Sequence, residues 1–454
     1  MLNPLYVTTD NAALMTDLYE LTMAAAYWSN QVTGTATFEL YFRRLPANRS
    51  YVVAAGLEQA LHYICKLQFS QHHVEWLRSL PQFKEVPSGF FEYLSRFRFT
   101  GEVWGVAEGT PIFPLEPILQ VRAPLIEAQI LETYLLSVIN MESLIATKAA
   151  RVTRAAAGRG IVDFGTRRAH GPQAGVLAAR ASYIGGCLGT SNVLAGYFTG
   201  IPVYGTAAHS FTMAFPTEFE AFRAYYRVFP SSTVLLIDTY DSLHAAKKVK
   251  DVGPGILAVR IDSGDLLDLS RKVRAILDGD GLNQVKILAS GDLNEWRIED
   301  LVMRGAPIDF FGVGTELVTS YDDPALSGVY KIVEATIGEK TEMRMKTSPG
   351  KRSYPGRKQI YRCRDGEYDS HDVLSLFGEE APQAGLPLLQ CYVRAGELVE
   401  ALPSLSDTRA WALEQRNRLP LELHKLNGSG EYPVTLSEDI RRRMQEMERV
   451  VKIS

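Results

Sequence analysis

The sequence of 454 residues has only four cysteines, Cys65, Cys187, Cys363 and Cys391, and no two of them form a Cys-x-x-Cys pair. This spacing argues against a disulfide framework and against a structural zinc site. The net charge is only −4, from 48 Lys and Arg against 52 Asp and Glu, so nucleic acid is not indicated as the main partner. The first residues lack a basic segment followed by an apolar core, and no secretory signal is predicted. We therefore expect a cytoplasmic protein.

The sequence also lacks a clean membrane-spanning segment. Residues 181–217 contain no Asp, Glu, Lys or Arg, but glycines and a proline interrupt them repeatedly. A membrane span needs about 20 predominantly apolar residues without such interruptions. We expect this segment to form buried helix, turn and strand in a large core.

The middle third of the chain alternates between short β-rich runs and helical patterns. Leu266, Leu269, Val273 and Leu277, for example, have the spacing of one buried helix face. Strands that alternate with helices of this length predict a parallel sheet built from βαβ units, and six such units favour a closed or nearly closed barrel. The β-rich runs are residues 161–164, 201–204, 233–238, 255–262, 285–290 and 308–314.

The two flanks of this core have a different pattern. Strand-like runs and helices mix between about residues 36 and 124, and β-like patterns return after Gly328, before a charged helix near the end. The segment 124–157 is predicted to be helical. The flanks predict an α+β domain assembled from both ends of the chain, with boundaries 1–124, 125–327 and 328–454.

Polar and small residues collect where the predicted strands end. Ligands bind at the carboxyl ends of parallel strands, because the loops and helix N-termini converge there. One such cluster could be helix capping, but six together predict an active-site face. The clusters are residues 163–168, 205–210, 238–241, 260–265, 290–292 and 312–315.

The late clusters suit a phosphate monoester. Gly291, Gly312 and Gly314 expose backbone N–H groups, and Thr315 adds a hydroxyl. The third glycine of a dinucleotide fingerprint is missing, and no Gly-x₄-Gly-Lys-Ser/Thr sequence occurs.

Other strand-end residues each leave two interpretations open. Asp238 and Asp262 could hold a Mg²⁺-bound polyphosphate or ribose hydroxyls, or could cap helices. His209 has small neighbours that leave its imidazole accessible, although a structural role is the alternative. Arg167 and Arg168 could bind a carboxylate or phosphate, or be ordinary surface arginines.

Six ordered motifs along almost the whole chain resemble the nicotinate phosphoribosyltransferase family. They are TDLYELTM (16–23), DFGTRRAHGP (163–172), GTAAHS (205–210), DTYD (238–241), VRIDSGDL (259–266) and GVGTELVTS (312–320). The resemblance implies an irregular TIM-like α/β barrel of the type II phosphoribosyltransferases, with an α/β sandwich domain built from both termini. It further implies a ligase that condenses nicotinate with phosphoribosyl pyrophosphate, giving nicotinate mononucleotide and pyrophosphate with ATP hydrolysis.

The resemblance also assigns roles to single residues. His209 occupies the position that ATP phosphorylates, and Asp238 and Asp262 match acids near the ribose, the pyrophosphate and Mg²⁺. A homodimer is implied, because Tyr19 matches an aromatic residue that covers the nicotinate ring of a neighbouring subunit. The matching nicotinate contacts are Tyr19, Phe164, Arg167 and Thr206. The matching phosphoribosyl pyrophosphate contacts are Arg260, Ser290, Gly291, Asp292, Gly312, Gly314 and Thr315.

Three alternatives remain open from the residues. Nicotinamide-using relatives have an aspartate after a Gly-Thr pair, where this chain has Gly189-Thr190-Ser191-Asn192; an acid there would repel nicotinate, so the acid substrate is favoured. A sugar-phosphate aldolase or isomerase would need a lysine or a metal-binding acid set, and no lysine lies in the six clusters. A silent scaffold should have lost residues that this chain keeps.

Overall fold

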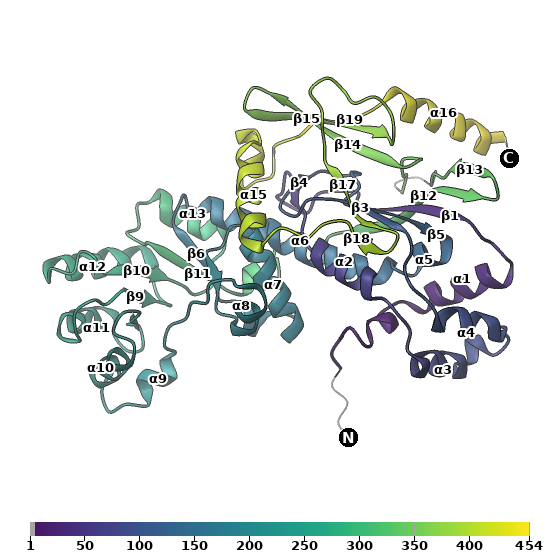
Figure 1. Ribbon diagram of the computed structural model, residues 1–454. Helices are drawn as coiled ribbons and strands as arrows, with labels where there is room; N and C mark the ends of the chain where they lie inside the picture. Colours follow the sequence, from purple (N-terminus) through teal and green to yellow (C-terminus); the bar gives the residue numbers. More distant parts are fainter. Residues whose placement is uncertain (1–4, 349–350, 454) are drawn as a thin grey trace. The chain divides into compact units, whose positions relative to one another are not determined.

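The computed structural model describes residues 5–348 and 351–453, and the chain packs as two compact units (Figure 1). The first unit comprises Met1–Leu144 and Ala325–Ser454, and the second comprises Ile145–Pro324. The division falls inside the long helix α6 (Glu132–Ala155). The three-part boundaries drawn from the sequence stay a prediction.

Both ends of the chain meet in the main sheet of the first unit. Its seven strands lie in the order β13-β12-β1-β5-β3-β17-β18, and every pair is antiparallel. The inner strand β1 is buried along nearly its whole length, so both of its faces are covered. The strands are β1 (Thr35–Phe42), β3 (Glu102–Val106), β5 (Leu119–Pro124), β12 (Gly328–Ile337), β13 (Lys340–Met343), β17 (Leu389–Arg394) and β18 (Glu397–Leu398).

Helices and two smaller sheets complete the first unit. The four-stranded sheet has the order β16-β14-β15-β19, and β2 pairs with β4. These strands are β2 (Val52–Val53), β4 (Pro111–Ile112), β14 (Lys358–Asp365), β15 (Tyr368–Leu376), β16 (Leu386–Pro387) and β19 (Val434–Leu436). The helices are α1 (Leu18–Ser29), α2 (Leu57–Lys66), α3 (Gln71–Ser79), α4 (Ser88–Ser95), α5 (Leu125–Gln129), α15 (Leu405–Asn417) and α16 (Glu438–Ile453).

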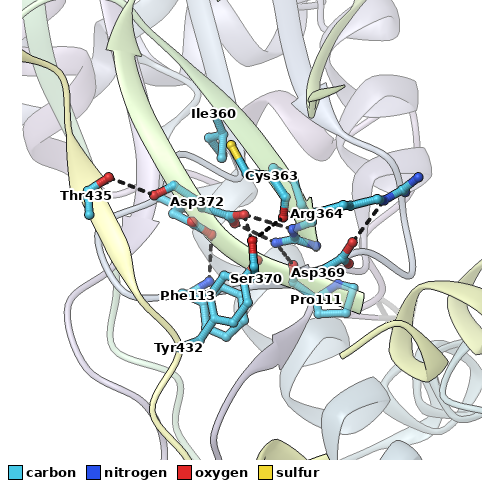
Figure 2. A network of polar contacts seen from close by, with 12 residues as sticks. Pro111, Phe113, Ile360, Cys363, Arg364, Asp369, Ser370, Asp372, Tyr432 and Thr435 are labelled. Carbon is cyan, nitrogen blue, oxygen red and sulfur yellow. Dashed lines mark hydrogen bonds and ion pairs between the residues drawn. The ribbon is translucent and has the colours of Figure 1, made fainter. Parts of the chain in front are cut away.

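A buried arginine links β14 to β15. Arg362 donates from Nε and Nη2 to the two carboxylate oxygens of Asp372 at 3.0 and 2.7 Å, and from Nη2 to the carbonyl of Pro111 at 2.8 Å. Tyr432 donates to Asp372 at 3.0 Å, and its ring stacks on Phe113 (Figure 2). The bidentate geometry offsets part of the cost of burying these charges.

The second unit contains a six-stranded sheet in which all neighbours are parallel. The strand order is β7-β6-β11-β10-β9-β8, and α12 (Leu266–Gly279) packs against β9 and β10 (Figure 1). Five of the six β-rich runs predicted from the sequence form strands. The remaining run, residues 201–204, contributes an isolated parallel bridge from Val203 to Thr190. The strands are β6 (Gly160–Asp163), β7 (Gly189–Thr190), β8 (Val234–Leu236), β9 (Ala258–Ile261), β10 (Lys286–Ala289) and β11 (Phe310–Val313).

The helices of this unit mostly follow a strand, as expected for βαβ units. Asp265 caps α12 by accepting from the N–H groups of Leu267 and Asp268, and Asn294 caps α13 in the same way. The remaining helices are α7 (Pro172–Ile184), α8 (Val193–Thr199), α9 (His209–Met213), α10 (Glu218–Val228), α11 (Ser242–Lys248), α13 (Glu295–Met303) and α14 (Thr315–Val318).

One helical stretch in the described chain, residues 125–155, is long and apolar enough to cross a membrane by length and composition. Buried positions make up 61% of its most apolar window, as in a core helix. It contains α5 and α6, so the helical prediction for residues 124–157 is confirmed. The uncharged segment 181–217 yields the end of α7, β7, α8 and α9.

Candidate active site

Four adjacent strands bring many of the predicted site residues to the carboxyl ends of the parallel strands. β6, β11, β10 and β9 are neighbours, and the loop after each strand begins at its carboxyl end. Because the strands are parallel, the four loops emerge on the same side.

Arg260 makes the most contacts with other predicted site residues at these strand ends. The residue lies on β9, and its guanidinium donates to Ser290 Oγ at 2.8 Å, to Thr206 Oγ1 at 2.8 Å and to Asp262 Oδ1 at 2.7 Å. The same guanidinium lies 5.4 Å from the centre of the Phe164 ring. One side chain therefore brings together four other residues predicted for the site, each from a different strand end or loop.

Asp262 is held as an anion within this cluster. Burial alone would raise its pKa, but hydrogen bonds from Ser290 and Arg260 outweigh that effect, and the pKa of Asp262 lies below its usual value. The carboxylate also faces His209, whose Nε2 lies 3.8 Å from Asp262 Oδ2.

His209 is the first residue of α9, and 43% of its side chain is exposed. Its Nδ1 lies 3.3 Å from Thr239 Oγ1, and its Nε2 faces Asp262. The imidazole is thus oriented on both sides and still reachable by a ligand. Thr239 was not singled out from the sequence, although it lies inside the DTYD motif.

Asp238 lies two residues after the end of β8, beside Ser263. The Ser263 hydroxyl donates to Asp238 Oδ2 at 2.5 Å, while Asp238 Oδ1 is buried and accepts no hydrogen bond from the described residues. An orphaned carboxylate oxygen is suited to a cation, since Mg²⁺ commonly takes one or two carboxylates together with substrate phosphates. Ser263 is a second contact that the sequence did not single out.

Two glycines, Gly291 in the loop after β10 and Gly312 near the end of β11, are required by close packing. Gly291 has φ +91°, and a Cβ there would lie 2.0 Å from the carbonyl oxygen of Asp262. A Cβ on Gly312 would lie 2.4 Å from the ring of Phe164. The small residues therefore let the loop and the ring approach β9 and β11 closely.

The other residues predicted here are less buried than Gly312. Asp292 and Thr315 are exposed, and Gly314 directly precedes α14. Arg297 donates to the backbone carbonyls of Gly291 and Asp292 at 3.3 and 3.5 Å, which restrains the first loop.

Two predicted nicotinate contacts, Arg167 and Tyr19, are not among the residues that Arg260 brings together. Arg167 lies on the short 3-10 helix Thr166–Arg168 after β6; it is exposed and makes no hydrogen bond or ion pair among the described residues. Tyr19 lies on α1 in the first unit, where 44% of it is exposed. Burial of its hydroxyl, together with Glu132 and Glu20, raises the pKa of Tyr19.

The chain matches the nicotinate phosphoribosyltransferase models over most of its length. Residues 14–140 match the N-terminal domain, 160–373 the family and 384–444 the C-terminal domain. The chain is 47% identical over 436 residues to nicotinate phosphoribosyltransferase pncB2 of Mycobacterium tuberculosis, an alignment that covers 94% of this chain and 92% of that protein. The chain belongs to the nicotinate phosphoribosyltransferase family.

More distant members of the nicotinate phosphoribosyltransferase family agree with this assignment. The enzyme of Bacillus subtilis is 38% identical over 95% of this chain and 94% of its own length. The crystal structure of human nicotinic acid phosphoribosyltransferase superposes with a TM-score of 0.84 at 30% identity, covering 95% of this chain and 99% of that one. The crystal structure of nicotinate-nucleotide pyrophosphorylase from Pyrococcus furiosus superposes with a TM-score of 0.76 at 26% identity, covering 92% of this chain and 99% of that one. The family and the type II phosphoribosyltransferase fold predicted from the sequence are confirmed.

Proposed function

We propose that this protein is an ATP-dependent nicotinate phosphoribosyltransferase that performs the first step of NAD salvage from nicotinate. It condenses nicotinate with phosphoribosyl pyrophosphate to nicotinate mononucleotide and pyrophosphate. The observation that carries the proposal is the Arg260 cluster, in which one guanidinium meets the aromatic ring of Phe164, the hydroxyls of Ser290 and Thr206 and the carboxylate of Asp262.

The reaction depends on positioning the nicotinate nitrogen against C1 of the ribose, and it needs no general base. The nicotinate ring nitrogen has a lone pair and attacks C1 of the ribose without losing a proton, while the C1–pyrophosphate bond breaks through an oxocarbenium-like state. Phe164 would stack on the pyridine ring, with Thr206 and the exposed guanidinium of Arg167 orienting its carboxylate. The anionic Asp262 beside Arg260 suits the positive charge that develops on the ribose.

The 5′-phosphate would lie in the cradle of the late loops. Gly312, Gly314 and Thr315 offer backbone N–H groups and a hydroxyl, and Gly291 and Asp292 form the other wall. Ser290 and Arg260 connect this cradle to the ribose side of the site.

Asp238, with Asp262, would hold Mg²⁺ together with the substrate pyrophosphate, because Asp238 Oδ1 is buried and has no hydrogen-bond partner among the described residues. When bound, the ion supplies charge neutralisation for the leaving pyrophosphate.

His209 would couple the synthesis to ATP. A ring nitrogen of the exposed imidazole attacks the γ-phosphorus, so that a P–N bond forms, the β–γ bridging P–O bond breaks and ADP leaves. Thr239 and Asp262 fix the ring orientation from its two nitrogens. Hydrolysis of the phosphohistidine then returns the free imidazole.

The chain around residues 189–192 favours nicotinate over nicotinamide. Thr190 is buried on β7 and donates to Asp163 at 2.7 Å, and the Asn192 side chain caps α8. Asp163 is the nearby acid, but it is fully buried and its other oxygen accepts from the N–H of Gly165 at 2.8 Å. These residues therefore present no free carboxylate that could accept a hydrogen bond from the amide of nicotinamide.

Purified protein supplied with phosphoribosyl pyrophosphate, Mg²⁺ and ATP should convert nicotinate with a kcat/KM at least ~100-fold above that for nicotinamide, since a mispaired polar group at such a site costs several kcal/mol. Product formation can be followed by chromatography of the mononucleotides. Comparable turnover of both pyridines would contradict the choice of the acid, and no product from either would contradict the transferase itself.

The proposed function also includes a homodimer, because Tyr19 is expected to complete the active site of a neighbouring subunit. We infer a cytoplasmic homodimer in which the exposed Tyr19 of one subunit covers the nicotinate ring of the other. Light scattering measures the mass, and a monomer at assay concentration would contradict the shared site.

A further inference from the structure

A buried cluster of charges lies beside the two late loops of the second unit. Lys148, on α6, is only 1% exposed, and Arg151, nearly one turn further along, is 8% exposed. Their partners are acids on the segments that follow the loops. None of these residues belongs to the Arg260 cluster.

Lys148 contacts both segments with one ammonium group. Its Nζ lies 2.6 Å from Oε2 of Glu295, the first residue of α13, which follows the Gly291 loop. The same atom lies 2.8 Å from Asp322 and 3.7 Å from Glu316, which directly follows Thr315. The ammonium therefore connects the carboxyl side of one phosphate loop to the carboxyl side of the other.

Arg151 fixes the first of these contacts. Its Nε donates to Glu295 Oε1 at 2.9 Å, and its guanidinium lies 5.6 Å from the centre of the Trp296 ring. Glu295 is fully buried, so its two oxygens are committed to the two cations of α6.

Stability alone is a weak reason for such a cluster. Removing several charges from water costs free energy that their attraction often fails to recover, and apolar residues of similar volume commonly stabilise a protein as well or better. An ion pair does supply fixed geometry, because its partners must stay at hydrogen-bonding distance. Here that geometry sets the separation of two loops.

We propose that Lys148 is a positioning residue. It holds residues 291–294, after β10, and residues 312–315, from the end of β11 into α14, at the spacing needed to bind the 5′-phosphate of phosphoribosyl pyrophosphate. This inference rests on the proposed function. Because the Lys148 side chain is only 1% exposed, its effect on substrate would be indirect.

The test compares two buried lysines. Lys148→Met should raise the KM for phosphoribosyl pyrophosphate about tenfold or more and leave the KM for nicotinate within about twofold, because only the phosphate loops lose their connection. The matched control is Lys358→Met in the first unit, since Lys358 is also 1% exposed and pairs with Glu39 at 2.8 Å. That variant should lower the melting temperature without changing either KM by more than about twofold.

A milder variant covers the case in which Lys148→Met does not fold. Asp322→Asn keeps the size of a side chain that is 21% exposed and weakens one contact of Lys148. It should raise the KM for phosphoribosyl pyrophosphate by about threefold without affecting that for nicotinate.

An unchanged KM for phosphoribosyl pyrophosphate in folded Lys148→Met, or in Asp322→Asn where the first does not fold, would overturn the positioning role. Equal increases of both KM values would overturn it as well. Failure of the wild-type protein to form nicotinate mononucleotide is a separate result, and it would overturn the proposed function instead.

Discussion

At the scale of single residues, the site depends on small residues as much as on charged ones. Arg260 can meet four partners because the backbone around it is tightly packed, and Gly291 and Gly312 permit that packing. The sequence predicts both glycines as phosphate contacts. The structure adds a steric reason that spacing alone does not reveal.

Gly312→Ala should therefore act through Phe164. The new Cβ would lie 2.4 Å from the ring, so the ring must move away from β11. We expect the KM for nicotinate to rise about tenfold, with a smaller change in the KM for phosphoribosyl pyrophosphate. Steady-state kinetics with each substrate varied in turn measures the two values.

Gly279→Ala is the matched control for that variant, because Gly279 ends α12 and a Cβ there meets no atom within 4 Å. It should leave both KM values unchanged. A Gly312→Ala enzyme with the wild-type KM for nicotinate would show that the Phe164 ring is not part of the nicotinate site.

At this scale the sequence identifies residues with distinctive chemistry. It does not identify the residues that form hydrogen bonds with them. His209, Arg260 and Asp262 stand out as a histidine, an arginine and an acid at strand ends. Thr239 and Ser263 do not, because hydroxyl residues are common in such turns and only the fold shows which of them face a partner. Lys148 is missed because it lies far from every motif in the sequence.

At the scale of helices and strands, the parallel core follows closely from the hydrophobic pattern. Five β-rich runs become strands because each is short, apolar and followed by a turn and a helix. The run 201–204 does not, since Val203 makes a single bridge and Tyr204 is exposed, which leaves little to bury. The Arg362 network of the first unit has no sequence signal, because polar residues that alternate along a strand normally face water.

That network makes the stability of the β14–β15 pair depend on pH. Glu116 is fully buried near Arg362 and Asp372, and burial together with the Asp372 carboxylate raises its pKa well above the usual value. The folded protein thus keeps a proton on Glu116 that the unfolded chain loses above a pH of about 4.3. Stability contributed by this group is present at low pH and is lost as the pH rises through the folded pKa.

Glu116→Gln removes this titration. The variant should match the wild type near pH 4 and be more stable by about 1 kcal/mol or more near pH 8, since one pKa unit is worth about 1.4 kcal/mol. Urea unfolding at both pH values measures the difference, with the exposed Glu85→Gln as a control that should change neither. Parallel pH dependences for Glu116→Gln and the wild type would contradict a protonated, buried Glu116.

At the scale of the whole molecule, the chain folds as two units of which one is built from both termini. The sequence indicates this arrangement because β-rich flanks enclose a βα core. In the structure, β1 from the first flank pairs directly with β12 from the second. The predicted site forms where the carboxyl ends of the parallel strands converge. The topology of the sheet brings these ends together whatever the sequence of the loops. The family is confirmed by the match along 94% of the chain, while the roles of single residues stay proposals.

The measurement that tests the central claim most directly is nicotinate mononucleotide formation with and without ATP, in the wild type and in His209→Ala. Coupling through a phosphohistidine predicts that ATP raises the yield at equilibrium in the wild type and that this gain disappears in the variant, while slow ATP-independent synthesis remains. A gain from ATP that survives in His209→Ala would contradict the coupling role of His209.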